Sequence, residues 1–321
     1  MYKQLTREQR YTIYVLLQNG KSKKEIASTI GVNKSTVYRE IKRNRSEKRG
    51  LYHWSRAEEY ARINKERLKR RRTVTSALYK KVVSLLQEEQ WSPKQISGSL
   101  LLNEGIHISH ETIYAIIRED MARGGTLYKN CRHKLRYRRH DRSYWKSKTK
   151  VKGIPNRVSI HDRPAEADGR RFGDWEMDTI IGKGAKDAIL TLCERSTNML
   201  MMCRLKDGRK SECVVEAVKR LLLPYRRYVR TITTDNGSEF TKHELISKAL
   251  HVKIYFTDSY SSWQKGAIEN TNKLIRQYIP KGSDFDTFSD AYIKEVQYKI
   301  NRRPREKLKF STPMKEFYKH F

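Results

Sequence analysis

Three acidic side chains in the C-terminal half of the chain have the types and settings needed for metal-ion chemistry. Asp178 lies in the apolar-rich run GDWEMDTIIG, and Asp235 ends the β-branched run VRTITTD at an Asp-Asn-Gly turn. Glu269 follows after a gap of 33 residues, early in a helical pattern. Three carboxylates converging from two strands and a helix form an all-oxygen site that suits Mg²⁺ or Mn²⁺, the ions used in phosphoryl transfer.

Each of these carboxylates also has an ordinary structural interpretation. Strand alternation places Asp174, Glu176 and Asp178 on one face, so the pattern leaves open which of them binds a metal. Asp235 suits the first position of a turn, and Glu239 is its local rival. A glutamate near a helix N-terminus is common. Together, three acids at element ends in a strongly basic chain favour the metal site.

The charge of the chain predicts a polyanionic partner. Its 321 residues include 69 Lys and Arg against 36 Asp and Glu, a net charge of +33. Residues 1–150 hold 36 of the basic and 14 of the acidic residues, so the N-terminal half is expected to be the main contact with nucleic acid. The alternative is a generally basic, solvated surface.

Cysteine usage and hydropathy exclude other classes of protein. The four cysteines form no CxxC pair, which disfavours a zinc or redox motif and predicts reduced thiols in an intracellular compartment. The N-terminal run MYKQLTREQR lacks the apolar core of a signal peptide, and the chain has no run of 18 apolar residues. We therefore expect neither secretion nor membrane insertion.

Residues 1–50 have the pattern of a helix-turn-helix DNA-binding domain. Ser22 with Glu25 caps a short second helix, Gly31 makes the turn, and Asn33 begins the third helix. A small helical bundle with a basic face is the alternative. The third helix leaves these side chains facing outward, toward phosphates and base edges: Lys34, Ser35, Thr36, Tyr38 and Arg39.

Two helical segments follow this domain. Residues 51–75 predict a basic helical connector, whose basic side chains either face solvent or contact DNA phosphates. Residues 76–120 predict a second helix-turn-helix-like domain, in which WSPKQI starts a helix with a serine cap and a proline at the first position. A purely structural helical pair is the alternative. The DNA-facing start of its last helix would consist of His110, Glu111 and Thr112.

Residues 121–155 predict a basic linker. Positions 121–150 contain 11 basic residues and one acidic residue, interleaved with aromatic side chains. Such a segment is expected to be loose when free and ordered along DNA when bound. Three arginines are candidates for phosphate or minor-groove contact: Arg136, Arg138 and Arg139.

Residues 156–321 predict an α/β catalytic domain. Three consecutive strands and then alternating helices and strands are the order of a ribonuclease-H-like fold, here with a mixed five-stranded sheet. The predicted strands are 174–182, 187–195, 198–205, 229–234 and 252–257, and the predicted helices are 211–223, 239–250, 264–278 and 285–301. The chain as a whole is therefore predicted to be multidomain, with all-α helix-turn-helix units before the α/β domain.

The helix that carries Glu269 also has a basic stripe. Lys265, Asn272, Lys273 and Arg276 fall on or near the same face at helical spacing. Basic side chains beside a carboxylate metal ligand would hold the DNA strand whose phosphate is attacked.

Sequence motifs along nearly the whole chain resemble those of the DDE transposases of the insertion-sequence-thirty family. They are LTREQR, EIASTIGVNKSTVYREIKRN, WSPKQI, ISHETIY, GGTLYK, PNRVSIHDRP, FGDWEMD, TTDNGSEF, WQKGAIENTNKLIRQYIPKG and INRRPREKLKFSTPMKEFY. The resemblance implies that Asp178, Asp235 and Glu269 are the acidic triad. It also matches Lys265 and Arg276 to basic positions around the glutamate, although Ser262 stands where many relatives of the wider superfamily have tyrosine.

The resemblance implies a DNA transposase of bacterial cytoplasm and nucleoid. Such an enzyme binds the terminal inverted repeats of an insertion sequence and performs metal-dependent cleavage and strand transfer with Mg²⁺, two ions being expected and Mn²⁺ an alternative. Its partners would be double-stranded DNA at the element ends and the target, and further copies of itself in a homodimer or higher oligomer. The rival functions are a non-catalytic DNA-binding regulator and a structure-specific nuclease.

Overall fold

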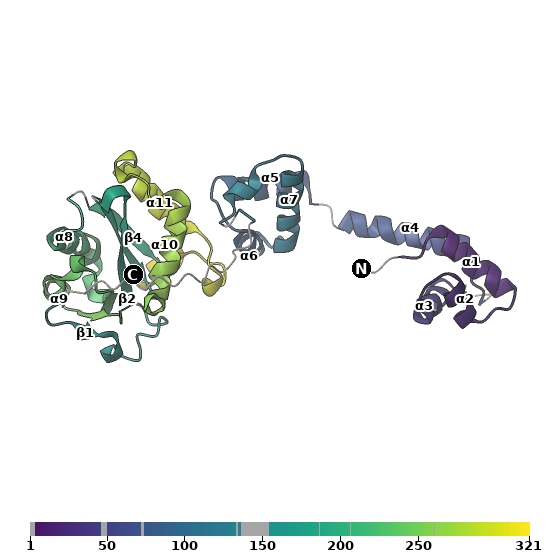
Figure 1. Cartoon of the computed structure of the whole chain (residues 1–321), viewed down its shortest axis with the longest axis horizontal. Helices are drawn as coiled ribbons and strands as arrows, with labels where there is room; N and C mark the ends of the chain where they lie inside the picture. The colour runs from purple at the N-terminus through teal and green to yellow at the C-terminus, as the bar shows by residue number, and fades with distance from the viewer. Residues whose placement is uncertain are drawn as a thin grey trace. The chain divides into compact units, whose positions relative to one another are not determined.

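The computed structural model of the protein describes residues 4–45, 50–71, 74–132, 134–135, 154–185, 187–205, 207–259 and 261–321. These residues belong to two compact units, Met1–Tyr79 and Lys80–Phe321, whose helices and strands are drawn in Figure 1. Each unit has its own hydrophobic core. The boundary between the units lies inside helix α5 (Ser76–Gln87).

The described residues of the N-terminal unit form the helices α1 (Arg7–Gln18), α2 (Lys23–Thr29), α3 (Lys34–Asn44) and α4 (Trp54–Arg71). Of these, α1, α2 and α3 begin at side-chain caps. α1 and α2 begin at capping boxes, in which Thr6 pairs with Gln9 and Ser22 pairs with Glu25. Asn33 caps α3 with its side chain. The three predicted helices of this domain are therefore confirmed.

A buried ion pair connects α3 to the other helices of this unit. The guanidinium of Arg10 on α1 lies 2.9 Å from Glu40 on α3 and 2.7 Å from Glu58 on α4. The apolar side chains that are fully buried nearby are Ile13, Ile26 and Val37. Because a buried charge without its partner is costly, this network fixes the orientation of α3.

The first helices of the second unit bury apolar side chains, among them Val82, Ile96 and Ile113. Helices α6 (Pro93–Glu104) and α7 (His110–Ala122) follow α5, and the short 3₁₀ helix η1 (Leu127–Asn130) comes after them. α6 begins at a Ser92 capping box with proline at its first position and ends at Gly105, whose φ of 67° is left-handed. The predicted start of this helix is confirmed.

A mixed sheet forms the centre of the second unit. Its strands are β1 (Val158–Ser159), β2 (Asp174–Ile181), β3 (Ala188–Glu194), β4 (Leu200–Leu205), β5 (Thr231–Thr234) and β6 (Lys253–Phe256). Their spatial order is β1-β6-β5-β2-β3-β4. β2, β3 and β4 pair antiparallel, whereas β2, β5, β6 and β1 pair parallel. The predicted fold class, helical units followed by a mixed α/β domain, is confirmed.

The predicted number of strands is wrong, because the sheet has six strands rather than five. The additional strand, β1, pairs parallel with β6, with Val158 opposite Tyr255. A strand of two residues is too short to show alternation in the sequence, and only its neighbour in space defines it.

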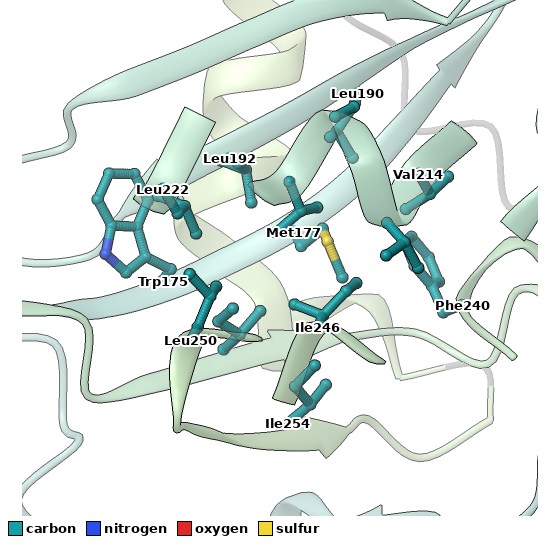
Figure 2. Close-up of a cluster of buried hydrophobic side chains, with 14 of the residues drawn as sticks. Trp175, Met177, Leu190, Leu192, Val214, Leu222, Phe240, Ile246, Leu250 and Ile254 are labelled. Carbon is teal, nitrogen blue, oxygen red and sulfur yellow. The ribbon is translucent and has the colours of Figure 1, made fainter. Parts of the chain in front are cut away.

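Helices cover the sheet on both faces. They are α8 (Ser211–Leu222), α9 (His243–Leu250), α10 (Gly266–Tyr278), α11 (Asp290–Arg302) and α12 (Pro313–Phe317). Figure 2 shows Trp175 and Met177 of β2 in the core with side chains of α8 and α9. Ile180 instead packs with Leu274 and Ile275 of α10. The even-numbered residues of β2, its acids included, therefore face α10, as alternation predicts.

Short 3₁₀ helices connect these elements. They are η2 (Ile160–Asp162), η3 (Lys183–Ala185), η4 (Leu223–Tyr228), η5 (Ser238–Phe240), η6 (Ser262–Lys265), η7 (Phe285–Thr287), η8 (Glu306–Leu308) and η9 (Tyr318–His320). Among the helices of the described segments, none has the length and apolar character needed to span a membrane.

Candidate active site

Asp178 and Asp235 meet where β2 and β5 lie side by side. The two strands pair parallel, with Glu176 opposite Thr233, and Asp235 directly follows the end of β5. The ammonium of Lys265 lies between the two carboxylates, 3.2 Å from Asp178 Oδ1 and 2.9 Å from Asp235 Oδ2. The two aspartates are therefore close enough to share one cation.

The other two carboxylate oxygens are held by amide groups. Asn272 on α10 donates from Nδ2 to Asp178 Oδ2 at 2.7 Å, and the backbone N–H of Gly237 donates to Asp235 Oδ1 at 3.0 Å. Each carboxylate oxygen has a second lone pair, so these contacts orient the carboxylates without exhausting their capacity as ligands.

The electrostatics of this pair favour additional positive charge. Burial raises the pKa of Asp178, and the nearby Asp235 raises it further, while Lys265 lowers it. Burial alone would lower the pKa of Lys265, but the two carboxylates outweigh that effect and raise it. The pKa of Asp178 thus stays raised although an ammonium lies beside it, because burial and the second carboxylate together outweigh Lys265.

Glu269 lies in the first turn of α10, and its carboxylate forms an ion pair with Lys273. One turn later on the same helix, Asn272 reaches Asp178. Within the described part of the chain, the three carboxylates do not form a group whose oxygens lie within 4.8 Å of one another. The structure thus links Asp178 to Asp235 through the Lys265 ammonium and places Glu269 on the adjacent helix.

The other two acids on the α10 face of β2 have structural partners. Asp174 accepts from the guanidinium of Arg171 at 2.9 and 3.0 Å. Glu176 accepts from Arg195 at 3.0 Å and from the backbone N–H of Ile268 at 2.8 Å. Of the three acids that alternation left open, only Asp178 faces Asp235, which favours it as the ligand.

A different group of three carboxylates does bring its oxygens close together. In the described residues, ligand oxygens of Asp187, Asp284 and Asp286 lie within 4.8 Å of one another. Arg204 forms ion pairs with Asp187, at 2.8 Å, and with Asp286. Asp284 caps η7, because its side chain accepts from the backbone N–H of Asp286 at 3.0 Å. Each acid of this cluster thus has a structural partner, which favours an ion-pair and capping group.

Glu239 is a buried acid beside the aspartate pair. It is 6% exposed, accepts from Thr179 Oγ1 at 2.7 Å and lies 3.6 Å from Arg209. Its carboxylate folds over Gly237, where an added Cβ would lie 2.6 Å from Glu239 Oε2 and 3.1 Å from Asp235 Oδ1. A side chain at position 237 would therefore have to displace one of these two carboxylates.

We expect Gly237→Ala to lower DNA cleavage by at least about tenfold, because the methyl group must push one of these carboxylates away. Gly266→Ala is the matched control, since an added Cβ there meets no atom within 4 Å. Cleavage of labelled end DNA and the melting temperature would be measured for both variants. Wild-type cleavage by Gly237→Ala would show that the close approach is not needed.

The basic residues predicted to form a stripe around Glu269 differ in burial and in their partners. Lys265 is 5% exposed and points inward to the aspartates. Lys273 is exposed on α10, beside Glu269. Arg276 is half-buried and donates to the backbone carbonyls of Pro280 and Ile181, and burial lowers its pKa. Lys273 is thus the basic residue of the stripe that is exposed to solvent.

The predicted recognition helix presents most of its candidate residues to solvent. On α3, Lys34, Ser35, Tyr38 and Arg39 are exposed, and Thr36 is half-buried. The Arg39 guanidinium donates to Ser35 within the helix, and the Lys23 ammonium lies 4.7 Å from the ring centre of Tyr38. These internal contacts are weak and solvent-exposed, so the side chains remain accessible.

The candidates at the start of α7 lie in the first turn of that helix. His110 and Glu111 are exposed, whereas Thr112 is half-buried and donates its backbone N–H to the Ser109 cap at 3.1 Å. Glu111 also lies 3.7 Å from Arg118. The linker candidates Arg136, Arg138 and Arg139 lie outside the described residues.

Comparison with known proteins agrees with this organisation. A family model described as a helix-turn-helix domain matches residues 1–44, and one described as a homeodomain-like domain matches residues 36–117. The chain is 44% identical over 321 residues to the transposase for insertion sequence element IS4351 of Bacteroides fragilis, covering 99% of this chain and 96% of the relative.

Two further relatives are also transposases of insertion sequences. The transposase for element IS1086 of Cupriavidus metallidurans is 33% identical, covering 98% of this chain and 94% of the relative. The transposase InsI for element IS30A of Escherichia coli (strain K12) is 34% identical, covering 96% of this chain and 82% of the relative. The chain therefore belongs to the insertion-sequence-thirty (IS30) family of transposases.

Proposed function

We propose that this transposase binds the terminal inverted repeats of its element and cleaves and joins DNA at their ends, with Asp178, Asp235 and Glu269 as its acidic triad. The observation that carries the proposal is the shared cation: the Lys265 ammonium lies 3.2 Å from Asp178 and 2.9 Å from Asp235. Two carboxylates from different strands that converge on one positive charge are suited to ligating a metal ion.

The donor atoms around this pair fit Mg²⁺, with Mn²⁺ as the alternative ion. They are carboxylate oxygens and an amide oxygen, which hard divalent cations prefer. Asn272 Oδ1 is buried and has no hydrogen-bond partner among the described groups. Asp178 and Asp235 would hold the ion between them, and Glu269 would complete the set for two ions from α10.

Bound divalent ions supply the positive charge that activates a nucleophilic oxygen and stabilises the leaving oxygen in phosphoryl transfer. The protein side chains keep the ligands in place. Asn272 and the Gly237 N–H orient the two aspartates, and Glu176 fixes the first turn of the helix that carries Glu269. Lys273, exposed beside Glu269, is suited to hold a DNA phosphate. No covalent bond between protein and DNA is needed.

The partners follow from this reaction. The exposed face of α3 and the net charge of +33 support binding to double-stranded DNA, at the element ends and at the target. Because two element ends must be joined together, we infer at least a homodimer on DNA. We place this activity in the bacterial cytoplasm, at the nucleoid.

One incubation separates this function from its rivals. The full-length protein, Mg²⁺ and labelled end DNA should give both cleaved and joined products. Cleavage without joining would support a structure-specific nuclease instead, and binding without either product would support a non-catalytic regulator.

Sequence-specific binding is expected to depend on α3. Arg39→Ala should weaken binding to end DNA by roughly tenfold or more, because a good base contact is worth about 1–3 kcal/mol. Its affinity for random DNA should change much less, since phosphate contacts carry no sequence information. Titration of both DNAs by fluorescence anisotropy measures the difference, and an equal loss on both would assign Arg39 to phosphate contact.

A further inference from the structure

Every proton of the Lys265 ammonium has an acceptor inside the protein. Its Nζ lies 2.9 Å from Asp235 Oδ2, 3.2 Å from Asp178 Oδ1 and 3.3 Å from the backbone carbonyl oxygen of Met177. A lysine ammonium has three protons, so these acceptors use all of them. As it lies in this structure, Lys265 therefore has no donor left for DNA.

The ammonium and a metal ion need the same oxygens. An ion held by the carboxylates of Asp178 and Asp235 would need the space that Nζ occupies between them. Two cations so close in a partly desolvated site repel each other strongly. They cannot both occupy the centre of this pair.

The local structure allows the side chain of Lys265 to move while its backbone stays in place. The neighbouring Gln264 is bonded twice to Asp258, each time at 2.8 Å, which holds η6. Lys265 itself makes no side-chain cap to α10, and its long side chain has four rotatable bonds. Departure of the ammonium breaks three hydrogen bonds, two of which are also ion pairs with Asp178 and Asp235.

We propose that Lys265 competes with the divalent ion for the Asp178–Asp235 pair, so that it sets the metal affinity of the site and is released when the ion binds. This inference rests on the proposed metal site. The lysine keeps two like charges together on neighbouring strands, and the ion takes over that role when it binds. If Lys265 instead only supported the ligand geometry, its removal would let the carboxylates separate and would weaken metal binding.

The first test is Mn²⁺ binding to the full-length protein, measured by isothermal titration calorimetry. Lys265→Gln should bind Mn²⁺ at least about tenfold more tightly than wild type, because one competing charge is gone. Lys265→Arg, which keeps the charge, should stay within about threefold of wild type. Lys299→Gln is the matched control, since Lys299 is a partly buried lysine on α11 paired with Glu295. Unchanged or weaker binding by Lys265→Gln overturns the proposal.

Asp178→Asn and Asp235→Asn separate this proposal from the metal site itself. If either variant binds Mn²⁺ like wild type, the proposed metal site is wrong. If both lose binding while Lys265→Gln is unchanged, the metal site stands and the competition is rejected.

The second test uses the unaltered protein, so it does not depend on the folding of a variant. Lys265 is 5% exposed and should react slowly with an amine-labelling reagent. Mg²⁺ should raise its labelling severalfold by mass spectrometry, while labelling of Lys299 stays constant. Equal protection of Lys265 with and without Mg²⁺, at concentrations where calorimetry shows binding, contradicts release.

Discussion

Asp178→Asn, Asp235→Asn and Glu269→Gln are each expected to lower DNA cleavage and joining by at least about a hundredfold, while binding to end DNA is retained. Loss of a group that only orients a metal ligand already costs about 10–100-fold, so loss of a ligand charge should cost more. Each amide keeps nearly the shape of its acid, and none of the three residues lies in the N-terminal unit. Gel assays of labelled end DNA, with binding measured separately, test the expectation.

The matched control is Glu212→Gln, which removes an exposed carboxylate paired with Lys242. It should cleave and join like wild type. An amide variant of the triad that joins DNA at close to the wild-type rate would show that its residue is not a ligand. For Asp178, the acid to test next would then be Glu176 on the same face of β2.

Glu176→Gln is expected to destabilise the second unit and to impair cleavage through the position of α10. The carboxylate of Glu176 is buried, pairs with Arg195 at 3.0 Å and accepts the Ile268 N–H at 2.8 Å. Removing the charge leaves the guanidinium without its buried partner, which costs about 3 kcal/mol. For a unit of this size we expect a fall in melting temperature of roughly 5–10 °C.

Two measurements distinguish positioning from simple loss of stability. Cleavage should fall even well below the melting temperature of Glu176→Gln, because the first turn of α10 sets where Glu269 stands. Glu216→Gln is the control: its pair with Lys219 is 2.9 Å long, but its side chain is 73% exposed, so little change is expected. Wild-type cleavage by folded Glu176→Gln would mean that this contact only stabilises the fold.

The sequence predicted the local structure well wherever a short-range signal was present. The caps at Ser22, Asn33 and Ser92 start helices, and the predicted strands and helices of 174–301 appear within a few residues of their expected bounds. These signals depend on residues within one turn of each other or on alternation along one strand. The two-residue strand β1 lacked such a signal and was missed.

The candidate site could be predicted only in part from the sequence. The residue types and the 33-residue gap identified Asp178, Asp235 and Glu269 as candidates. The role of Glu176 could not be predicted, because its partner Ile268 is 92 positions away along the chain. Similarly, helical spacing predicted Lys265 as part of an exposed basic stripe, whereas it is buried against the aspartates.

The sequence alone therefore determined most of the helices and strands, the face of β2 that carries the acids, and the family to which the chain belongs. Those properties follow from local periodicity and from motif strings. Only the tertiary structure decided which acid of that face meets Asp235 and which side chain stands between them. Asp178 and Asp235 meet because β2 pairs with β5, and Lys265 reaches them because α10 packs on the same face. Such contacts join residues distant along the chain, and their energies depend on burial and on charge partners that no local pattern specifies.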